Sequence, residues 1–139
     1  MLSRKAKYAL RALGALAASE SGSLPAWQIA ERARIPEKFL ESILVELRHA
    51  GLVRSRRGLA GGHALALPAA AITLGQVIRA IDGPIAPTRC ASVTAYQPCS
   101  DCPQPARCAI RAVMADVRDA TAAVLDHRSL AQLFDAEAI

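Results

Sequence analysis

The feature that most constrains this fold is a pair of helical patterns separated by only two residues. Residues 26–33 predict a short helix, and Pro25 suits its entry because proline lacks an N–H that a helix start leaves unpaired anyway. After Arg34 and Ile35, residues 36–50 predict an amphipathic helix with a polar outer face. Two helices joined by so tight a turn are typical of a helix-turn-helix. The side chains expected to pack inward are Trp27, Ile29 and Ala30 from the first helix and Phe39, Leu40, Ile43, Leu44 and Leu47 from the second.

Two short segments with strand-like alternation follow. They span residues 52–56 and 63–67, and a stretch with three glycines separates them, so they predict a β-hairpin. Glycines at the tip let the backbone approach another surface closely, and arginines at the base can contact phosphate or enter a narrow minor groove. A flexible loop with ordinary surface arginines is the alternative. Directly after a helix-turn-helix, the pattern favours a wing.

Helical patterns also flank this region, at residues 5–19, 74–82, 108–126 and 130–134. Thr73 and Gln76 have the spacing of a capping box, and Ser129 is placed to cap the last helix. Abundant alanine and an aromatic content of only 4% favour helix over sheet. We therefore expect a mainly α winged helix-turn-helix with a long C-terminal dimerisation helix.

Charge is distributed unevenly along the chain. Residues 1–67 hold eleven Lys and Arg against five Asp and Glu, whereas residues 68–139 hold six against seven. The excess positive charge therefore lies in the half that carries the helix-turn-helix. Such a field favours phosphate binding, although a solvated basic surface is an equal alternative on charge alone.

Four cysteines, Cys90, Cys99, Cys102 and Cys108, lie within nineteen residues of a proline-rich stretch. No run of about twenty apolar residues is present, and the start MLSRKAKYAL lacks a secretory signal, so we expect a cytoplasmic protein. Structural disulfides are uncommon in that compartment. An iron–sulfur cluster, a structural zinc and a bare thiol switch all stay open. A thiol redox enzyme is disfavoured because prolines flank the CxxC pair in a loop.

Three segments resemble one known family. The start LSRKAKYALRALGALA, the stretch IAERARIPEKFLESILVELRHAGLVRSRRGLAGGHALA and the turn AIDGPI resemble the IscR/NsrR/RirA-type bacterial winged-helix regulators. The resemblance covers essentially the whole chain, and the glycine-rich wing is its most specific part. It implies a non-enzymatic homodimeric regulator that binds double-stranded palindromic promoter DNA. Many members hold an iron–sulfur cluster in the loop before the dimerisation helix, and others hold none.

The resemblance also suggests the metal ligands. It places Cys90 and Cys108 on the family's first and last cluster cysteines. Arg111 stands where some members have a histidine ligand, and the first helix offers no carboxylate in its first turns. We therefore expect Cys99 and Cys102 to complete an all-cysteine set. Four thiolates suit a [4Fe–4S] or a [2Fe–2S] cluster, so the nuclearity stays open.

The expected organisation has three parts. Residues 1–82 form the DNA-binding domain, residues 83–107 the cysteine-rich cluster-binding loop, and residues 108–139 the dimerisation helix with a short last helix. Glu41 matches a family position that faces base edges, where it can accept from a cytosine amino group. The residues expected at DNA are Arg4, Lys5, Glu37, Lys38, Glu41, Arg54, Arg56, Arg57 and Gly58. The residues expected at the dimer seam are Ile110, Val113, Met114, Val117, Thr121 and Val124.

The function that follows is transcription regulation. We expect a repressor that senses iron, redox or nitric oxide status through metal binding at the cysteine loop. No membrane partner and no small-molecule substrate are expected.

Overall fold

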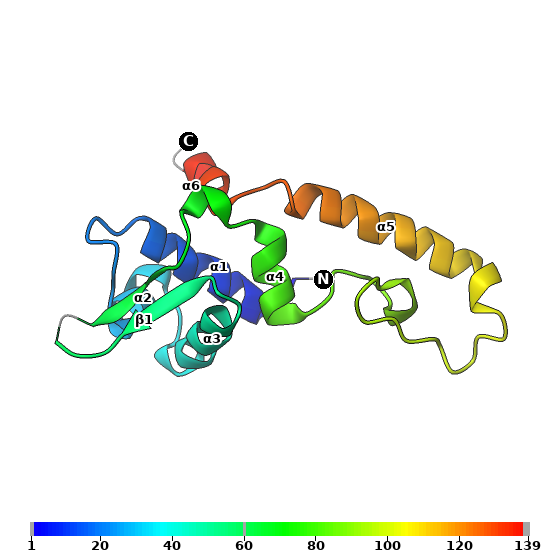
Figure 1. Cartoon of the computed structure of the whole chain (residues 1–139), viewed down its shortest axis with the longest axis horizontal. Helices are drawn as coiled ribbons and strands as arrows, with labels where there is room; N and C mark the ends of the chain where they lie inside the picture. The colour runs from blue at the N-terminus through cyan, green and yellow to red at the C-terminus, as the bar shows by residue number, and fades with distance from the viewer. Residues whose placement is uncertain (1, 60, 138–139) are drawn as a thin grey trace.

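A winged helical body with one projecting arm makes up the molecule (Figure 1). This computed structural model describes residues 2–59 and 61–137. The body comprises α1 (Arg4–Ala17), α2 (Ala26–Ala33), α3 (Glu37–His49), β1 (Val53–Arg56), β2 (Gly62–Leu65), the 3₁₀ turn η1 (Ala69–Ala71) and α4 (Leu74–Asp82). The arm holds the 3₁₀ turns η2 (Arg89–Ala91) and η3 (Pro105–Arg107) and α5 (Ala109–Leu125), after which α6 (Leu130–Glu137) returns to the body. The mainly α winged-helix fold predicted from the sequence is confirmed.

α1 lies at the centre of the body and packs against α2, α3, α4, α6 and β2. Gly14 lies opposite the ring of Phe134, and a Cβ at this position would overlap that ring. The glycine therefore lets α6 pack closely on α1. The largest fully buried side chains of the core are Leu13, Ile29, Leu40, Ile43, Leu47, Ile72, Val77 and Leu130.

The turn between α2 and α3 is set by its backbone. Arg34 adopts the left-handed conformation, with φ 53°, and ends α2. The amide of Ile35 donates to the carbonyl of Ala30 at 2.9 Å, and the Ile35 side chain is buried. These contacts fix the angle at which α3 leaves α2.

The predicted helix caps are present. Thr73 Oγ1 accepts from the Gln76 amide at 3.1 Å, and Gln76 Oε1 accepts from the Thr73 amide at 2.9 Å, which completes the capping box. Ser129 and Gln132 make the same reciprocal pair at the start of α6. Each cap satisfies amides that a helix start leaves without partners.

Two aromatic side chains lie elsewhere than the sequence predicted. Trp27 is 58% exposed and Phe39 is 46% exposed, so the expectation that both pack inward is wrong. Trp27 lies about 200° around α2 from Ile29, which is the face turned away from the core. Phe39 lies beside Tyr8 at the edge of the body, with their ring centroids 6.4 Å apart.

The arm joins the body at the end of α5. Arg79 of α4 donates to both carboxylate oxygens of Asp126, at 2.5 and 3.0 Å. The hydrogen bonds from Arg79 hold the pKa of Asp126 below its usual range. Beyond this contact, α5 and the cysteine loop extend away from the body (Figure 1). Within the described residues, no helix is long and apolar enough to cross a membrane.

Candidate functional site

The outer face of α3 is free of the core. Leu40, Ile43, Leu44 and Leu47 are buried on its inner face, whereas Glu37, Lys38, Glu41, Val45 and Arg48 are exposed. Pro36, the N-cap residue, provides no side-chain hydrogen bond to the first turn. The first amides of α3 are therefore available to an outside acceptor such as a phosphate oxygen.

The wing is a two-stranded antiparallel hairpin. Arg54 pairs with Ala64 and Arg56 with Gly62, so the two arginines share one face of the ribbon, and both are exposed. Arg57 and Gly58 follow at the tip and are also exposed. The wing prediction is confirmed, except that its alanine at position 60 lies outside the described residues.

The wing tip depends on a glycine. A Cβ at Gly61 would collide with the carbonyl oxygens of Arg56 and Gly58, while its amide donates to the Gly58 carbonyl at 2.9 Å. Only glycine allows so tight a turn. The side chain of Leu59 is fully exposed at this tip, a feature that the sequence analysis did not anticipate.

His63 anchors the wing to the body. Its amide donates to the Leu24 carbonyl at 2.8 Å, its carbonyl accepts from the Leu24 amide at 2.9 Å, and Nδ1 lies 2.8 Å from Ser55 Oγ. Burial, with the charge of Arg48 adding to it, lowers the pKa of His63. The imidazole is therefore a structural, neutral group at the base of the hairpin.

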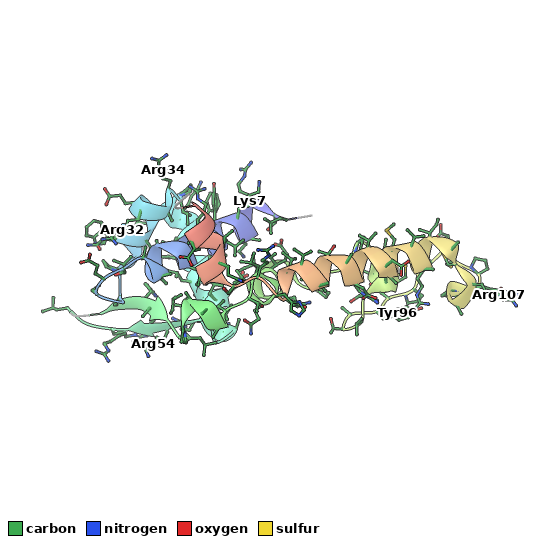
Figure 2. The ribbon with its side chains drawn as sticks, turned by 90° about the horizontal axis from the view of Figure 1, so that it is seen from above. Lys7, Arg32, Arg34, Arg54, Tyr96 and Arg107 are labelled. Carbon is green, nitrogen blue, oxygen red and sulfur yellow. The ribbon has the colours of Figure 1, made fainter. Side chains whose placement is uncertain are left out.

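The basic residues of the body differ in their surroundings. Arg4 is exposed at the start of α1, whereas Lys5 forms an ion pair with Glu46 of α3. Lys5 thus braces α3 against α1, a role that sequence reasoning missed. Figure 2 shows Arg32 and Arg34 on one side of the body and Arg54 of the wing on the opposite side.

The cysteine loop brings two of its four thiols together. Cys90 is buried in η2, Cys99 is exposed, and Cys102 and Cys108 are partly buried. Thr88 Oγ1 lies 3.3 Å from Cys90 Sγ. Hydrogen bonds from Thr88 first and from the Cys99 thiol second lower the pKa of Cys90, and the contact with Cys90 raises the pKa of Cys99.

The other two cysteines occupy separate turns. The Cys102 amide donates to the Cys99 carbonyl at 3.4 Å, which closes the CxxC turn. Cys108, at the start of the helix predicted over residues 108–126, is the N-cap of α5, and its Sγ accepts from the Arg111 amide at 3.4 Å. Among the side chains that the structure describes in residues 2–59 and 61–135, no three His, Cys, Asp or Glu converge as metal ligands.

Two arginines of α5 hold the loop near Cys90. Arg111 Nε donates to the Cys90 carbonyl at 2.8 Å, and its guanidinium carbon lies 5.5 Å from the centre of the Tyr96 ring. Arg118 donates to the Ala91 carbonyl and pairs with Asp119 at 2.7 Å. No sequence pattern predicts these contacts, because they join α5 to residues more than twenty positions away.

α5 presents the apolar stripe predicted for a dimer seam. Ile110 is 70%, Val113 54%, Val117 42% and Val124 59% exposed, and no residue along the described length of α5 is buried. Met114 is partly buried. Thr121 is exposed, and its hydroxyl donates to the Val117 carbonyl at 2.8 Å. Within one chain, this face has no cover.

The comparison with known families agrees with the geometry. The Rrf2 family, described as iron-dependent transcriptional regulators, matches residues 2–136. This chain belongs to the Rrf2 family. A member of that family is a transcription regulator, not an enzyme, and the relatives that the chain resembles are named accordingly.

Relatives of known sequence and structure support the assignment. The rrf2-like HTH-type transcriptional regulator of Rhodobacter capsulatus is 46% identical over 121 residues, 84% of this chain and 81% of its own. The HTH-type transcriptional regulator IscR of Escherichia coli is 35% identical over 133 residues, 95% of this chain and 78% of its own. The solved structure of CymR, the global cysteine regulator of B. subtilis, has a TM-score of 0.74 at 33% identity and covers 96% of this chain and 95% of its own. The T. potens IscR structure also has a TM-score of 0.74, at 29% identity, covering 99% and 88%.

Proposed function

We propose that this Rrf2 regulator is a homodimeric repressor that binds palindromic promoter DNA and responds to iron, redox or nitric oxide status through its cysteine loop. The observation that carries the DNA-binding part is the exposed outer face of α3 beside a wing with three exposed arginines. Such a face and wing match the needs of major-groove and minor-groove contact. In this arrangement the residues 1–82 bind DNA, the residues 83–107 sense, and the residues 108–139 hold the dimer.

At DNA, the N-terminal turns of α3 would enter the major groove. Lys38 and the free amides of the first turn suit phosphate or base edges, and Glu41 suits a cytosine amino group. Arg54, Arg56 and Arg57 would follow the flanking backbone. Two half-sites one helical turn apart, roughly 34 Å, would match the two-fold symmetry of a dimer.

A second copy of the chain is the proposed cover for α5. Four apolar side chains on one face of this helix are between 42% and 70% exposed, and contiguous exposed apolar surface marks protein–protein interaction sites. Pairing with the same helix of a second copy removes that surface from water on both chains. An isologous seam also gives the two-fold symmetry that a palindromic site requires.

The cysteine loop is the proposed site of an iron–sulfur cluster. Its donors fit such a group in kind, because four free thiols within nineteen residues make a complete Cys₄ set, and the Cys90 and Cys99 thiols interact. Cys102 and Cys108 would complete the set. A bound [2Fe–2S] or [4Fe–4S] cluster would supply a group that reacts with oxidants and nitric oxide. Four reduced thiols also suit the proposed cytoplasmic location.

A thiol switch without metal is the second candidate. It is favoured by one observation, the contact between Cys90 and Cys99 together with the lowered pKa of Cys90. A thiol whose pKa is lowered, beside a second thiol, is the arrangement from which a disulfide forms once an oxidant is present. A zinc site with the same ligands is the remaining use.

Anaerobic purification tests these candidates together. The cluster predicts iron and acid-labile sulfide in the purified dimer, and each of the four Cys→Ala variants should lose most of the iron while far-ultraviolet circular dichroism stays unchanged. Zinc in place of iron, or no metal with a Cys90–Cys99 disulfide after mild oxidation, would reject the cluster in favour of the alternatives. Full iron retention in a Cys90→Ala/Cys99→Ala double variant would reject all-cysteine ligation.

A further inference from the structure

The first part of the cysteine loop is a small folded turn. The amides of Ala91 and Ser92 donate to the carbonyls of Thr88 and Arg89, both at 3.1 Å, and the Gln97 amide donates to the Arg89 carbonyl at 3.2 Å. Cys90, Ala91 and Ser92 are buried, whereas residues 93–101 are exposed. We call residues 88–92 the Cys90 turn.

The turn leaves carbonyl oxygens that its own backbone does not use. The carbonyls of Cys90 and Ala91 instead accept from Arg111 and Arg118, which lie seven residues apart on α5. Seven residues are nearly two helical turns, so both side chains leave the same face of α5 from points about 10 Å apart. The two guanidinium groups therefore bond two successive carbonyls of the turn from one helix.

Each arginine is itself held in place. Arg118 is only 20% exposed at its side chain and pairs with Asp119 at 2.7 Å, while Arg111 lies over the Tyr96 ring. Charge-assisted hydrogen bonds from guanidinium groups are stronger than neutral ones. This face of α5 is about 100° around the helix axis from the apolar stripe that contains Val117. One helix thus has the Cys90 turn on one face and the proposed seam on the next.

We propose that Arg111 and Arg118 are positioning residues that fasten the Cys90 turn to α5 before any metal or cluster binds. Cys90 is then a fixed point on the dimer helix, and the exposed Cys99 and the CxxC turn close on it. If the proposed function holds, a change at the cysteines moves the Cys90 turn, and this turn is hydrogen-bonded to α5, the helix of the proposed dimer seam. Arg111 thus contributes here as a donor to the backbone, since a guanidinium cannot ligate iron.

Amide hydrogen exchange of the metal-free, reduced full-length protein tests the fastening itself. In Arg111→Ala/Arg118→Ala, the amides of Ala91, Ser92 and Gln97 should exchange at least tenfold faster than in the wild type. Arg107→Ala is the matched control, because Arg107 belongs to the same arm and its guanidinium makes no hydrogen bond or ion pair within the described residues. Unchanged exchange at these three amides in the double variant would overturn the proposal.

Two further measurements keep the result interpretable. Amides of α1 and α3 should exchange as in the wild type; if the double variant disturbs them, Arg118→Ala alone replaces it, with at least threefold faster exchange at Ser92 expected and unchanged exchange overturning the proposal. After anaerobic iron and sulfide loading, the double variant should hold less than half the iron of the Arg107→Ala control, and equal iron would overturn the link to Cys90. A wild type that takes up no iron would reject the proposed cluster, whereas the exchange result would still decide the fastening.

Discussion

The body and the arm of this protein differ in how much of their surface one chain can satisfy. In the body, side chains from α1, α2, α3, α4 and α6 form one core. The start of α4 is capped, and the turn after α2 sets the direction of α3. In the arm, the apolar stripe of α5 has no cover. The cysteines there do not gather with other His, Cys, Asp or Glu side chains into a group of three or more among the described residues. One chain thus buries the apolar core of the body, whereas we propose that a second copy covers α5 and that a bound group occupies the cysteine loop.

The largest effect is expected at the uncovered stripe. Val117→Asp places a charge in the middle of the proposed seam, where desolvation has no compensating partner, so the dimer dissociation constant should rise at least about 100-fold. Sedimentation velocity would detect the monomer. Asp116→Ala, a change at a neighbouring exposed position, is the control, and a Val117→Asp protein that remains a tight dimer would show that α5 is not the seam.

A core variant tests the completeness of the body. Ile43→Ala deletes a fully buried side chain, and such changes lower the free energy of unfolding by about 2–5 kcal/mol. Val113→Ala, at an exposed position of the arm, should leave the unfolding of the separated protomer nearly unchanged. Urea unfolding at low protein concentration compares the two. Equal losses from both variants would contradict the division between body and arm.

A wing variant examines the surface that the body offers to DNA. Arg57→Ala should weaken binding to promoter DNA and reduce the slope of log affinity against log salt by about one, because one phosphate contact is lost. Fluorescence anisotropy at several salt concentrations measures both. Arg107→Ala, in the arm, should leave the slope as it is. The same slope and affinity in Arg57→Ala would remove Arg57 from the interface.

The smallest effect concerns the wing base. The pKa of His63 is lowered from 6.5, so the unfolded chain takes up a proton at His63 before the folded chain does. The stability that neutral His63 contributes is therefore complete above pH 6.5 and is lost as the pH falls toward and through the lowered folded value. The melting temperature of the wild type should fall more steeply below pH 6.5 than that of His63→Gln. His49→Gln, at an exposed position, should follow the wild type, and parallel curves for all three would exclude His63 as the titrating group.

Sequence patterns predicted the body more completely than the arm, for physical reasons. The bounds of α2 and α4 agree with the prediction because local signals, Pro25 and the Thr73–Gln76 box, mark where a helix can begin. Trp27 and Phe39 were misplaced because a large apolar side chain was assumed to be internal. Whether such a side chain is buried depends instead on its position around the helix axis.

The contacts of the arm follow from no local rule. The Arg111–Cys90 hydrogen bond joins residues 21 positions apart through a backbone carbonyl, which any residue type provides. The position of Cys108 at the start of α5 was predictable because helix periodicity begins there. The approach of Cys90 to Cys99 depends on the path of the intervening turn, which the spacing of the cysteines alone does not specify.

The decisive measurement for the proposed function is the affinity of the dimer for its own promoter DNA, determined anaerobically with and without iron and sulfide loading. Under the proposed function, a group bound in the arm changes how tightly the body binds DNA. This predicts affinities that differ by roughly 5- to 150-fold between the loaded and stripped dimers, and no such difference when all four cysteines are replaced by alanine. Equal affinities for loaded and stripped wild-type protein would contradict the proposed function, because a group bound in the arm would then have no effect on DNA binding by the body.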